Sequence, residues 1–250
     1  MATRSPRIHA TAIVDARAEV DASVEIGPYC VVGAGVVIGA GTRLMSHVVV
    51  EGPTAIGRDN VVHPFAAIGG KPQHKRDQAG PSRLVIGDAN VLREHVTIHR
   101  GTDGGTTSVG SHALLMVGAH VAHDVTLGSH VTIANGVQLA GHAVVEDYAT
   151  FGGLSGVAQF VRVGESAFVA AGAMVEREVP PYVIVQGDRA RVRALNKVGL
   201  RRRGVSEESI AALDRAFRMI FASRRAQREA AKEMVSDDPF VAKLVAAVLR

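Results

Sequence analysis

The stretch Ile26-Gly-Pro-Tyr-Cys-Val-Val32-Gly-Ala-Gly-Val-Val-Ile38-Gly-Ala-Gly-Thr-Arg-Leu44 places an aliphatic residue at every sixth position. The same phase begins at Ile8 and continues without exception to Ile68. Glycine follows many of these aliphatic residues, which suggests backbone corners that other residues resist. A period of six does not fit the 3.6-residue period of a helix, and it favours short strands that each point one side chain inward.

The six-residue repeat continues through most of the chain. It returns at Ile86, Leu92 and Ile98, and then runs one residue out of phase at Val109, Leu115, Val121, Leu127, Ile133, Leu139, Val145, Phe151, Val157, Val163, Val169 and Val175. Three such strands form one coil of 18 residues, and coils stacked about 4.8 Å apart form a parallel β-helix with a narrow aliphatic interior. The composition agrees, because only 4% of residues are aromatic, none is Trp, and 27 are Gly. We therefore predict an all-β parallel β-helix over residues 1–187.

Two interruptions of the repeat predict loops that leave the helix. Residues 70–82 include the wholly polar run from Gln73 to Gln78, and residues 99–108 include a run rich in Gly and Thr. Loops on a rigid scaffold often carry function.

The last quarter of the chain has a different pattern, which predicts an α-helical domain over residues 188–250. Ser206 can cap a helix, and Asp238-Pro239 can begin the last one. The first of these helices would bury one face, formed by Ile210, Leu213, Phe217, Ile220 and Phe221.

Charge and cysteine content predict a cytoplasmic protein. The net charge is only +4, and the single cysteine, Cys30, cannot form an internal disulfide, so we expect a small buried filler. The first residues lead into no apolar secretory core. Residues 125–145 carry no Asp, Glu, Lys or Arg, but Ser129, His130, Asn135, Gln138 and His142 within them argue against a membrane span.

The densest polar cluster lies at Ala119-His-Val-Ala-His-Asp124. In the register above, Val121 points inward and His123 points outward. One coil further on, Gly141 lies beneath His123 and His142 beneath Asp124. The cluster therefore predicts one external cleft shared by His120, His123, Asp124 and His142.

This cluster allows three interpretations. Histidine titrates near neutrality and suits a general base, which an adjacent carboxylate can orient. Zinc is a second possibility, because His120, His123 and His142 are three neutral imidazoles. The third is that these are surface histidines that fill polar corners.

Several strings together resemble the UDP-N-acetylglucosamine acyltransferase family that begins lipid A biosynthesis, over nearly the whole chain. They are Ala119-His-Val-Ala-His-Asp124, Leu139-Ala-Gly-His142, Thr97-Ile-His-Arg-Gly-Thr102, Val179-Pro-Pro-Tyr-Val-Ile184 and Gly199-Leu-Arg-Arg-Arg-Gly204. The resemblance implies a left-handed parallel β-helix and a homotrimer with active sites between neighbouring subunits. It also implies transfer of a 3-hydroxyacyl chain from acyl carrier protein to the glucosamine 3-hydroxyl, without a cofactor or metal. Zinc carbonic anhydrases share the hexad, but they separate two ligand histidines by four residues, a spacing absent here.

The resemblance also implies roles for individual residues. His123 would be the general base, Asp124 its orienting partner, and the Gly141 N–H the oxyanion donor. Substrate binding would involve His120, His142, Gln159, Gln73, Arg76, Asn196, Arg202 and Arg203, of which the last three would hold the nucleotide and its phosphates. Ala171 and Arg189 would limit the length of the acyl chain.

A basic stripe in the C-terminal region offers a surface for acyl carrier protein, because its charge would attract acidic helices. The stripe consists of Arg189, Arg191, Arg193, Lys197, Arg201, Arg202 and Arg203. A solvated helix face is the alternative interpretation. We expect no nucleic-acid partner, since no recognised binding motif accompanies the charge.

Three departures from the family pattern concern substrate choice. Ala158 stands where the family usually has His, the loop reads Pro72-Gln73-His74-Lys75-Arg76-Asp77, and Ala171 stands where Gly is frequent. These departures leave two alternatives open: N-acylation of a UDP-3-amino sugar, and a catalytically silent trimeric binding scaffold.

Overall fold

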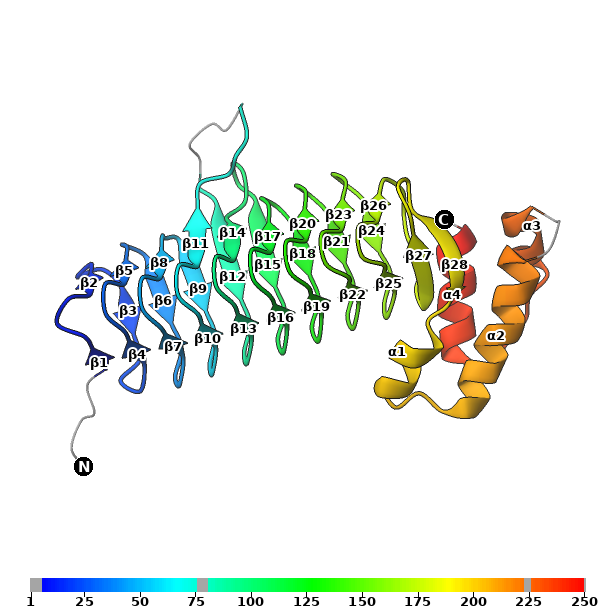
Figure 1. Ribbon diagram of the computed structural model, residues 1–250, viewed down its shortest axis with the longest axis horizontal. Helices are drawn as coiled ribbons and strands as arrows, with labels where there is room; N and C mark the ends of the chain where they lie inside the picture. Colours follow the sequence, from blue (N-terminus) through cyan, green and yellow to red (C-terminus); the bar gives the residue numbers. More distant parts are fainter. Residues whose placement is uncertain (1–5, 76–80, 223–225, 250) are drawn as a thin grey trace.

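The computed structural model describes residues 6–75, 81–222 and 226–249. Most of this chain winds into a long prism of short parallel strands, with helices packed at the C-terminal end (Figure 1). Residues in successive coils pair in register, for example Ile8 with Ile26 and His120 with Gln138. The predicted parallel β-helix is confirmed.

Three sheets form the sides of the prism among the described residues. The first contains β1 (Arg7–Ile8), β4 (Glu25–Ile26), β7 (Arg43–Leu44), β10 (Val61–Val62), β13 (Val91–Leu92), β16 (Leu114–Leu115), β19 (Thr132–Ile133), β22 (Thr150–Phe151), β25 (Phe168–Val169), β27 (Val183–Gln186) and β28 (Arg191–Leu195). The second contains β2 (Ile13–Val14), β5 (Val31–Val32), β8 (Val49–Val50), β11 (Ala67–Gly70), β14 (Thr97–His99), β17 (His120–Val121), β20 (Gln138–Leu139), β23 (Gly156–Val157) and β26 (Met174–Val175). The third contains β3 (Glu19–Val20), β6 (Val36–Ile38), β9 (Thr54–Ile56), β12 (Arg83–Ile86), β15 (Thr106–Val109), β18 (Thr126–Leu127), β21 (Val144–Val145) and β24 (Arg162–Val163).

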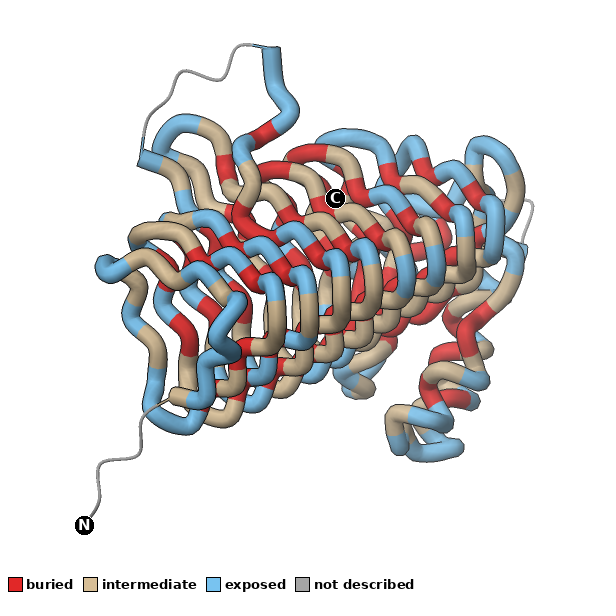
Figure 2. Tube along the Cα trace, turned by 60° about the vertical axis from the view of Figure 1, so that its left-hand side comes forward, coloured by how far each residue is buried: buried red, intermediate tan, exposed pale blue. Residues whose placement is uncertain are grey.

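The apolar residues of the repeat are mostly buried and form the core of the prism, and buried positions recur from coil to coil in Figure 2. Ile26, Leu92 and Phe151 are almost fully buried, and Cys30 is buried as expected. Ile8 differs, because its side chain is 42% exposed. It belongs to the coil at the N-terminal end of the prism, which pairs with the following coil and is not covered by any other described coil.

Most of the glycines that follow the aliphatic positions serve close approach between coils, which corrects the role suggested by the sequence, whereas Gly69 has a positive φ of 78° as that role requires. A Cβ at Gly27 would lie 2.7 Å from the carbonyl oxygen of Met45, and one at Gly39 would lie 2.7 Å from that of Gly57. Positive φ angles occur at other corner positions, including Tyr29 and Asp124.

The first interruption follows β11, and the second is shorter than the predicted loop over residues 99–108, because His99 belongs to β14 and residues 106–108 belong to β15. Buried polar residues bridge the coils that contain the two interruptions. The Asn60 N–H binds Thr42 Oγ1 across 18 residues, whereas the Asn90 N–H binds Asn60 Oδ1 across 30 and the Ala113 N–H binds Asn90 Oδ1 across 23. The strand pairs around both insertions stay in register, apart from a shift between Ile68 and Gly70 where β11 pairs with β14. The described part of the first loop projects above β11 and β14 in Figure 1.

The C-terminal region adds α1 (Lys197–Arg202), α2 (Glu207–Phe221), α3 (Gln227–Lys232) and α4 (Pro239–Leu249). Ser206 caps α2 by accepting the Ser209 N–H at 3.2 Å, and Ile210, Leu213 and Ile220 are buried, as the sequence predicts. Before these helices, β28 turns back antiparallel to β27, so residues 191–195 first extend the first sheet. None of the described helices is long and apolar enough to cross a membrane.

Candidate active site

His123 and Asp124 lie at the corner between β17 and β18. The chain turns there because Asp124 has a φ of 60°, in the left-handed region that Asp tolerates better than most residues. Val121 points into the core, as the register predicts, and His123 is only 5% exposed. The corner therefore presents two polar side chains from a rigid and tightly packed coil.

The two side chains form a hydrogen-bonded pair. His123 Nδ1 lies 2.9 Å from Asp124 Oδ2. Burial acts to raise the pKa of Asp124, but hydrogen bonds from His123 and Thr102 outweigh it, and the pKa lies below its ordinary value. An ionised Asp124 holds the proton of His123 on Nδ1, which leaves Nε2 free to accept a proton.

Gly141 lies directly against the ring of His123, one coil further on. A Cβ at Gly141 would lie 2.6 Å from Cε1 and 2.7 Å from Nε2 of His123. The absence of a side chain therefore lets the imidazole rest on the backbone of the next coil. Within the part of the chain that the structure describes, the Gly141 N–H donates no hydrogen bond.

His120 and His142 flank the pair in different ways. His120 Nδ1 lies 2.7 Å from Thr97 Oγ1, and burial, with smaller effects of neighbouring histidines, lowers the pKa of His120 to about 4. His120 is therefore neutral at physiological pH. His142 stacks on Phe160, and its Nε2 lies 3.6 Å from Asp124 Oδ2.

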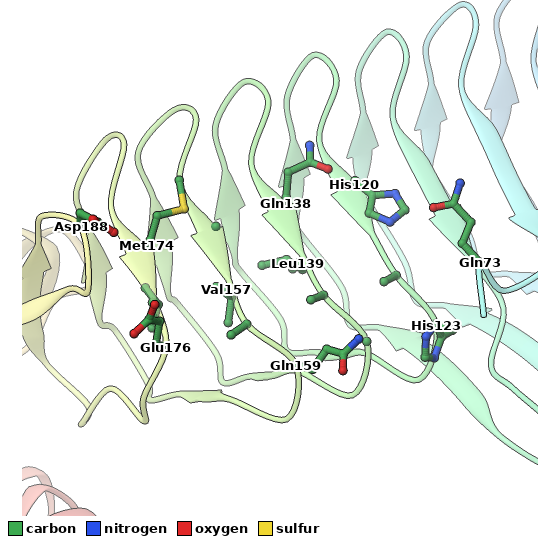
Figure 3. A pocket seen from close by; sticks show the side chains of 16 residues that line it. Gln73, His120, His123, Gln138, Leu139, Val157, Gln159, Met174, Glu176 and Asp188 are labelled. Atoms are coloured by element: carbon green, nitrogen blue, oxygen red, sulfur yellow. The ribbon is translucent and has the colours of Figure 1, made fainter. Parts of the chain in front are cut away.

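A cavity of about 580 Å³ opens beside these residues along the second sheet (Figure 3). Its lining includes five of the predicted residues: Gln73, His120, His123, Gly141 and Gln159. Ala158, the position that departs from the family pattern, also lines it. Further along the prism the lining becomes more apolar, with Gly156, Val157, Met174 and Val175, and then includes Glu176 and Asp188. The cavity thus joins a polar end, beside the histidines, to an apolar stretch.

Asn196, Arg202 and Arg203 line a separate cavity of about 670 Å³, against the first sheet. Asn196 is buried and caps α1, since its Oδ1 accepts the Gly199 N–H at 3.0 Å. Arg203 forms an ion pair with Glu165, and its guanidinium lies 4.1 Å from the centroid of the Tyr148 ring. One chain therefore carries the predicted base and the predicted nucleotide residues on different faces.

Three predicted residues are not found at either cavity. Arg76 lies outside the described residues. Ala171 and Arg189 are exposed, and the described lining of the 580 Å³ cavity contains neither of them.

Comparison with known proteins agrees with this geometry. Residues 178–250 match UDP-N-acetylglucosamine O-acyltransferase, domain 2, and residues 106–141 match the bacterial transferase hexapeptide of six repeats. The acyl-[acyl-carrier-protein]–UDP-N-acetylglucosamine O-acyltransferase of Synechocystis is 51% identical over 93% of this chain and 85% of its own length. The chain belongs to this acyltransferase family. Among solved structures, the enzyme of Acinetobacter baumannii has a TM-score of 0.91 at 39% identity over 96% of both chains. The UDP-N-acetylglucosamine acyltransferase of Arabidopsis has a TM-score of 0.84 at 32% identity, over 96% of this chain and 95% of its own.

Membership of this acyltransferase family confirms the left-handed β-helix and the family resemblance found in the sequence. It also identifies the chain as an enzyme of the acyltransferase class.

Three side chains that could bind a metal ion lie close together, but they are not the three histidines of the zinc interpretation. Ligand atoms of His123, Asp124 and His142 lie within 4.8 Å of one another, whereas His120 is not in this group and its Nδ1 contacts Thr97.

Several residues of the cavity were missed by sequence reasoning. Gln138, Gly156 and Met174 line it because each is the outward residue of its strand, and they follow His120 at steps of one coil along the second sheet. The same 18-residue register that placed Gly141 beneath His123 would have found them. Thr102 and Glu165 were also missed, since nothing in the repeat indicates their long-range partners.

Proposed function

We propose that this chain transfers a 3-hydroxyacyl group from acyl carrier protein to the 3-hydroxyl of UDP-N-acetylglucosamine, the first step of lipid A biosynthesis. The observation that carries this proposal is the pair of His123 and Asp124, 2.9 Å apart, at the polar end of a 580 Å³ cavity with an apolar extension. A sugar hydroxyl fits the polar end and an acyl chain fits the extension.

In the reaction, Nε2 of His123 removes the proton from the sugar 3-hydroxyl as its oxygen attacks the thioester carbonyl. The Gly141 N–H stabilises the negative charge of the tetrahedral intermediate. When the intermediate collapses, the carbon–sulfur bond breaks and the imidazolium returns its proton to the departing thiolate. Asp124 keeps the imidazole in the required tautomer throughout. The thioester supplies the driving force, so the reaction needs no cofactor or metal.

His120, His142, Gln73, Gln159 and Arg76 hold the substrates around this base. His120 is suited to a neutral hydrogen-bonding role because its pKa is about 4. Ala171 and Arg189 would limit the length of the acyl chain, although neither lines the 580 Å³ cavity of the single chain.

A homotrimer accounts for the separation of the predicted residues on two faces. A neighbouring subunit would bring its Asn196, Arg202 and Arg203 toward the cavity of the first, so that one nucleotide sugar contacts both. An exposed apolar strip on the second sheet supports such an interface, since Ile13 is 67% exposed and Val31 and Val49 are also exposed.

Acyl carrier protein would dock on the basic stripe in a cytoplasmic reaction. Arg189, Arg191, Arg193 and Arg202 are exposed. Arg201 forms an ion pair with Glu207 at 2.7 Å, and Lys197 forms one with Asp214 at 2.9 Å. Arg203 pairs with Glu165. Arg201 is also exposed, but the other four exposed arginines form no ion pair with any described residue and are therefore the better candidates for attracting an acidic carrier.

The test is a transfer assay with purified protein, a series of 3-hydroxyacyl carrier proteins, and either UDP-N-acetylglucosamine or its 3-amino analogue. We expect a 3-O-acyl product by mass spectrometry, and loss of at least 100-fold in kcat for His123→Ala. His9→Ala, at an exposed histidine of the first coil, is the control. Preference for the amine would establish N-acylation instead, and binding of UDP-sugar without turnover would establish the scaffold alternative.

A further inference from the structure

The turn that follows β14, residues 100–105, closes around the carboxylate of Asp124. The Thr102 hydroxyl donates to Asp124 Oδ2 at 2.8 Å, and the Thr102 N–H lies 3.1 Å from Oδ2 and 3.2 Å from Oδ1. A Cβ at Gly105 would overlap Oδ1. One turn thus supplies two donors to the carboxylate and leaves room for it.

The turn is anchored by its own backbone. The Gly105 N–H donates to the Thr102 carbonyl at 2.7 Å, and the Gly104 N–H donates to the Pro81 carbonyl at 3.0 Å. The Arg83 N–H donates to the Gly105 carbonyl at 3.2 Å. These bonds tie Thr102 to the end of the first loop, so its position does not depend on Asp124 alone.

Several polar groups surround Asp124, but only His123 is proposed to take part directly in acyl transfer. Oδ2 accepts from His123 and from Thr102, and the Asp124 N–H donates to Thr107 Oγ1 at 2.7 Å. His142 Nε2 faces the same oxygen at 3.6 Å. The Asp124 side chain is only 10% exposed, so water cannot readily replace a donor that is lost.

We propose that Thr102 is a positioning residue for the proposed acyl transfer, and that its hydroxyl orients the Asp124 carboxylate toward His123. This inference rests on the proposed function of the His123 and Asp124 pair. Thr102 contacts no reacting atom and acts through Asp124. Its two donors, the hydroxyl and the backbone N–H, fix the plane of the carboxylate and so its direction toward Nδ1 of His123.

Thr102→Val tests the hydroxyl, because it retains the branched shape and the backbone N–H. We expect kcat to fall about 10- to 100-fold with little change in KM, since orientation of the base is lost and substrate contacts are not. Without one of its donors the carboxylate binds a proton more readily. The acid limb of the kcat/KM profile should therefore move to higher pH.

Thr102→Ser keeps the hydroxyl and should restore most of the activity and the profile. Thr126→Val, at an exposed threonine of β18, is the matched control and should behave like the wild-type protein. If Thr102→Val and Thr126→Val have the same kcat and the same pH profile, the inference is wrong.

A second measurement does not require turnover. Nitrogen-15 NMR of histidine-labelled protein reports the fraction of His123 that carries its proton on Nδ1, with the signal assigned by its loss in His123→Gln. We expect this tautomer to dominate in the wild-type protein and in Thr102→Ser, and to be less populated in Thr102→Val. Absence of acyl transfer in the wild-type protein would overturn the proposed function, whereas an unchanged tautomer in Thr102→Val would overturn the role of Thr102.

Discussion

Replacement of Gly141 by Ala should disable the site without unfolding the protein. The φ of Gly141 is not in the left-handed region, so its backbone accepts an L residue. The new methyl group, however, would lie 2.6 Å from Cε1, 2.7 Å from Nε2 and 3.1 Å from Nδ1 of His123. Carbon atoms in contact prefer a separation of about 3.6 Å, so the imidazole must move by about 1 Å.

A movement of this size disrupts the pair of His123 and Asp124. Their hydrogen bond measures 2.9 Å, and about 1 Å of added separation would end it. Misplacement of a catalytic group by about 1 Å costs roughly 100-fold in rate, equivalent to about 2.7 kcal/mol in activation free energy. We therefore expect kcat to fall about 100-fold in Gly141→Ala, although the N–H of residue 141 is retained.

The assay is steady-state acyl transfer, accompanied by thermal unfolding monitored by circular dichroism. Gly153→Ala is the control, because a Cβ there would approach only Asn135 O, at an ordinary 3.4 Å. Wild-type kcat in Gly141→Ala would refute the steric argument. So would an equal loss of activity in Gly153→Ala.

Three further predictions concern charge, protonation and substrate size. Glu165→Gln should lower the free energy of unfolding by about 3 kcal/mol at pH 7, because it leaves Arg203 and Lys243 without their shared carboxylate. Although burial opposes it, pairing with Lys243 and Arg203 lowers the pKa of Glu165 below 4.5, so this contribution is present above pH 4.5 and is lost as pH falls through the lowered pKa. Chemical denaturation at pH 7 and near pH 3 should show a smaller difference between variant and wild type at the lower pH; an equal difference would contradict the assignment. Proton NMR should show His120 neutral from pH 5 upward, with its titration centred at about 4, and a midpoint above 6 would contradict the effect of burial. Met174→Gly should shift preference toward longer acyl chains, by roughly tenfold per added methylene, in a competition assay between donors; unchanged preference would exclude Met174 from the acyl path.

The repeat made most of the fold and the centre of the site predictable. Once the phase of Val121 was known, an 18-residue step placed Gly141 against His123, and the structure has that arrangement. Prediction succeeded here because each coil is constrained by its immediate neighbours, so local periodicity carries the three-dimensional position.

Prediction was weaker wherever the chain leaves the repeat. Thr102 reaches Asp124 from a turn whose path no period specifies. Lys243 reaches Glu165 across 78 residues, through the packing of α4 against the prism. The glycines after the aliphatic positions were interpreted as conformational, but at most of them, including Gly27 and Gly39, contact between coils excludes a side chain.

The outward residues of successive strands in the second sheet set the length of the cavity wall, and this length can change in two ways. The strands are β17, β20, β23 and β26. His120, Gln138, Gly156 and Met174 stand on successive rungs, so three steps of about 4.8 Å give the cavity wall a length of roughly 14 Å. Gain or loss of a whole 18-residue coil would change this length by one coarse step while leaving every remaining pair in register. Exchange of a single outward side chain would change it by a fraction of a step. A β-helix enzyme of this design can therefore evolve the size of its substrate in coarse and fine increments, without moving the corner that holds His123.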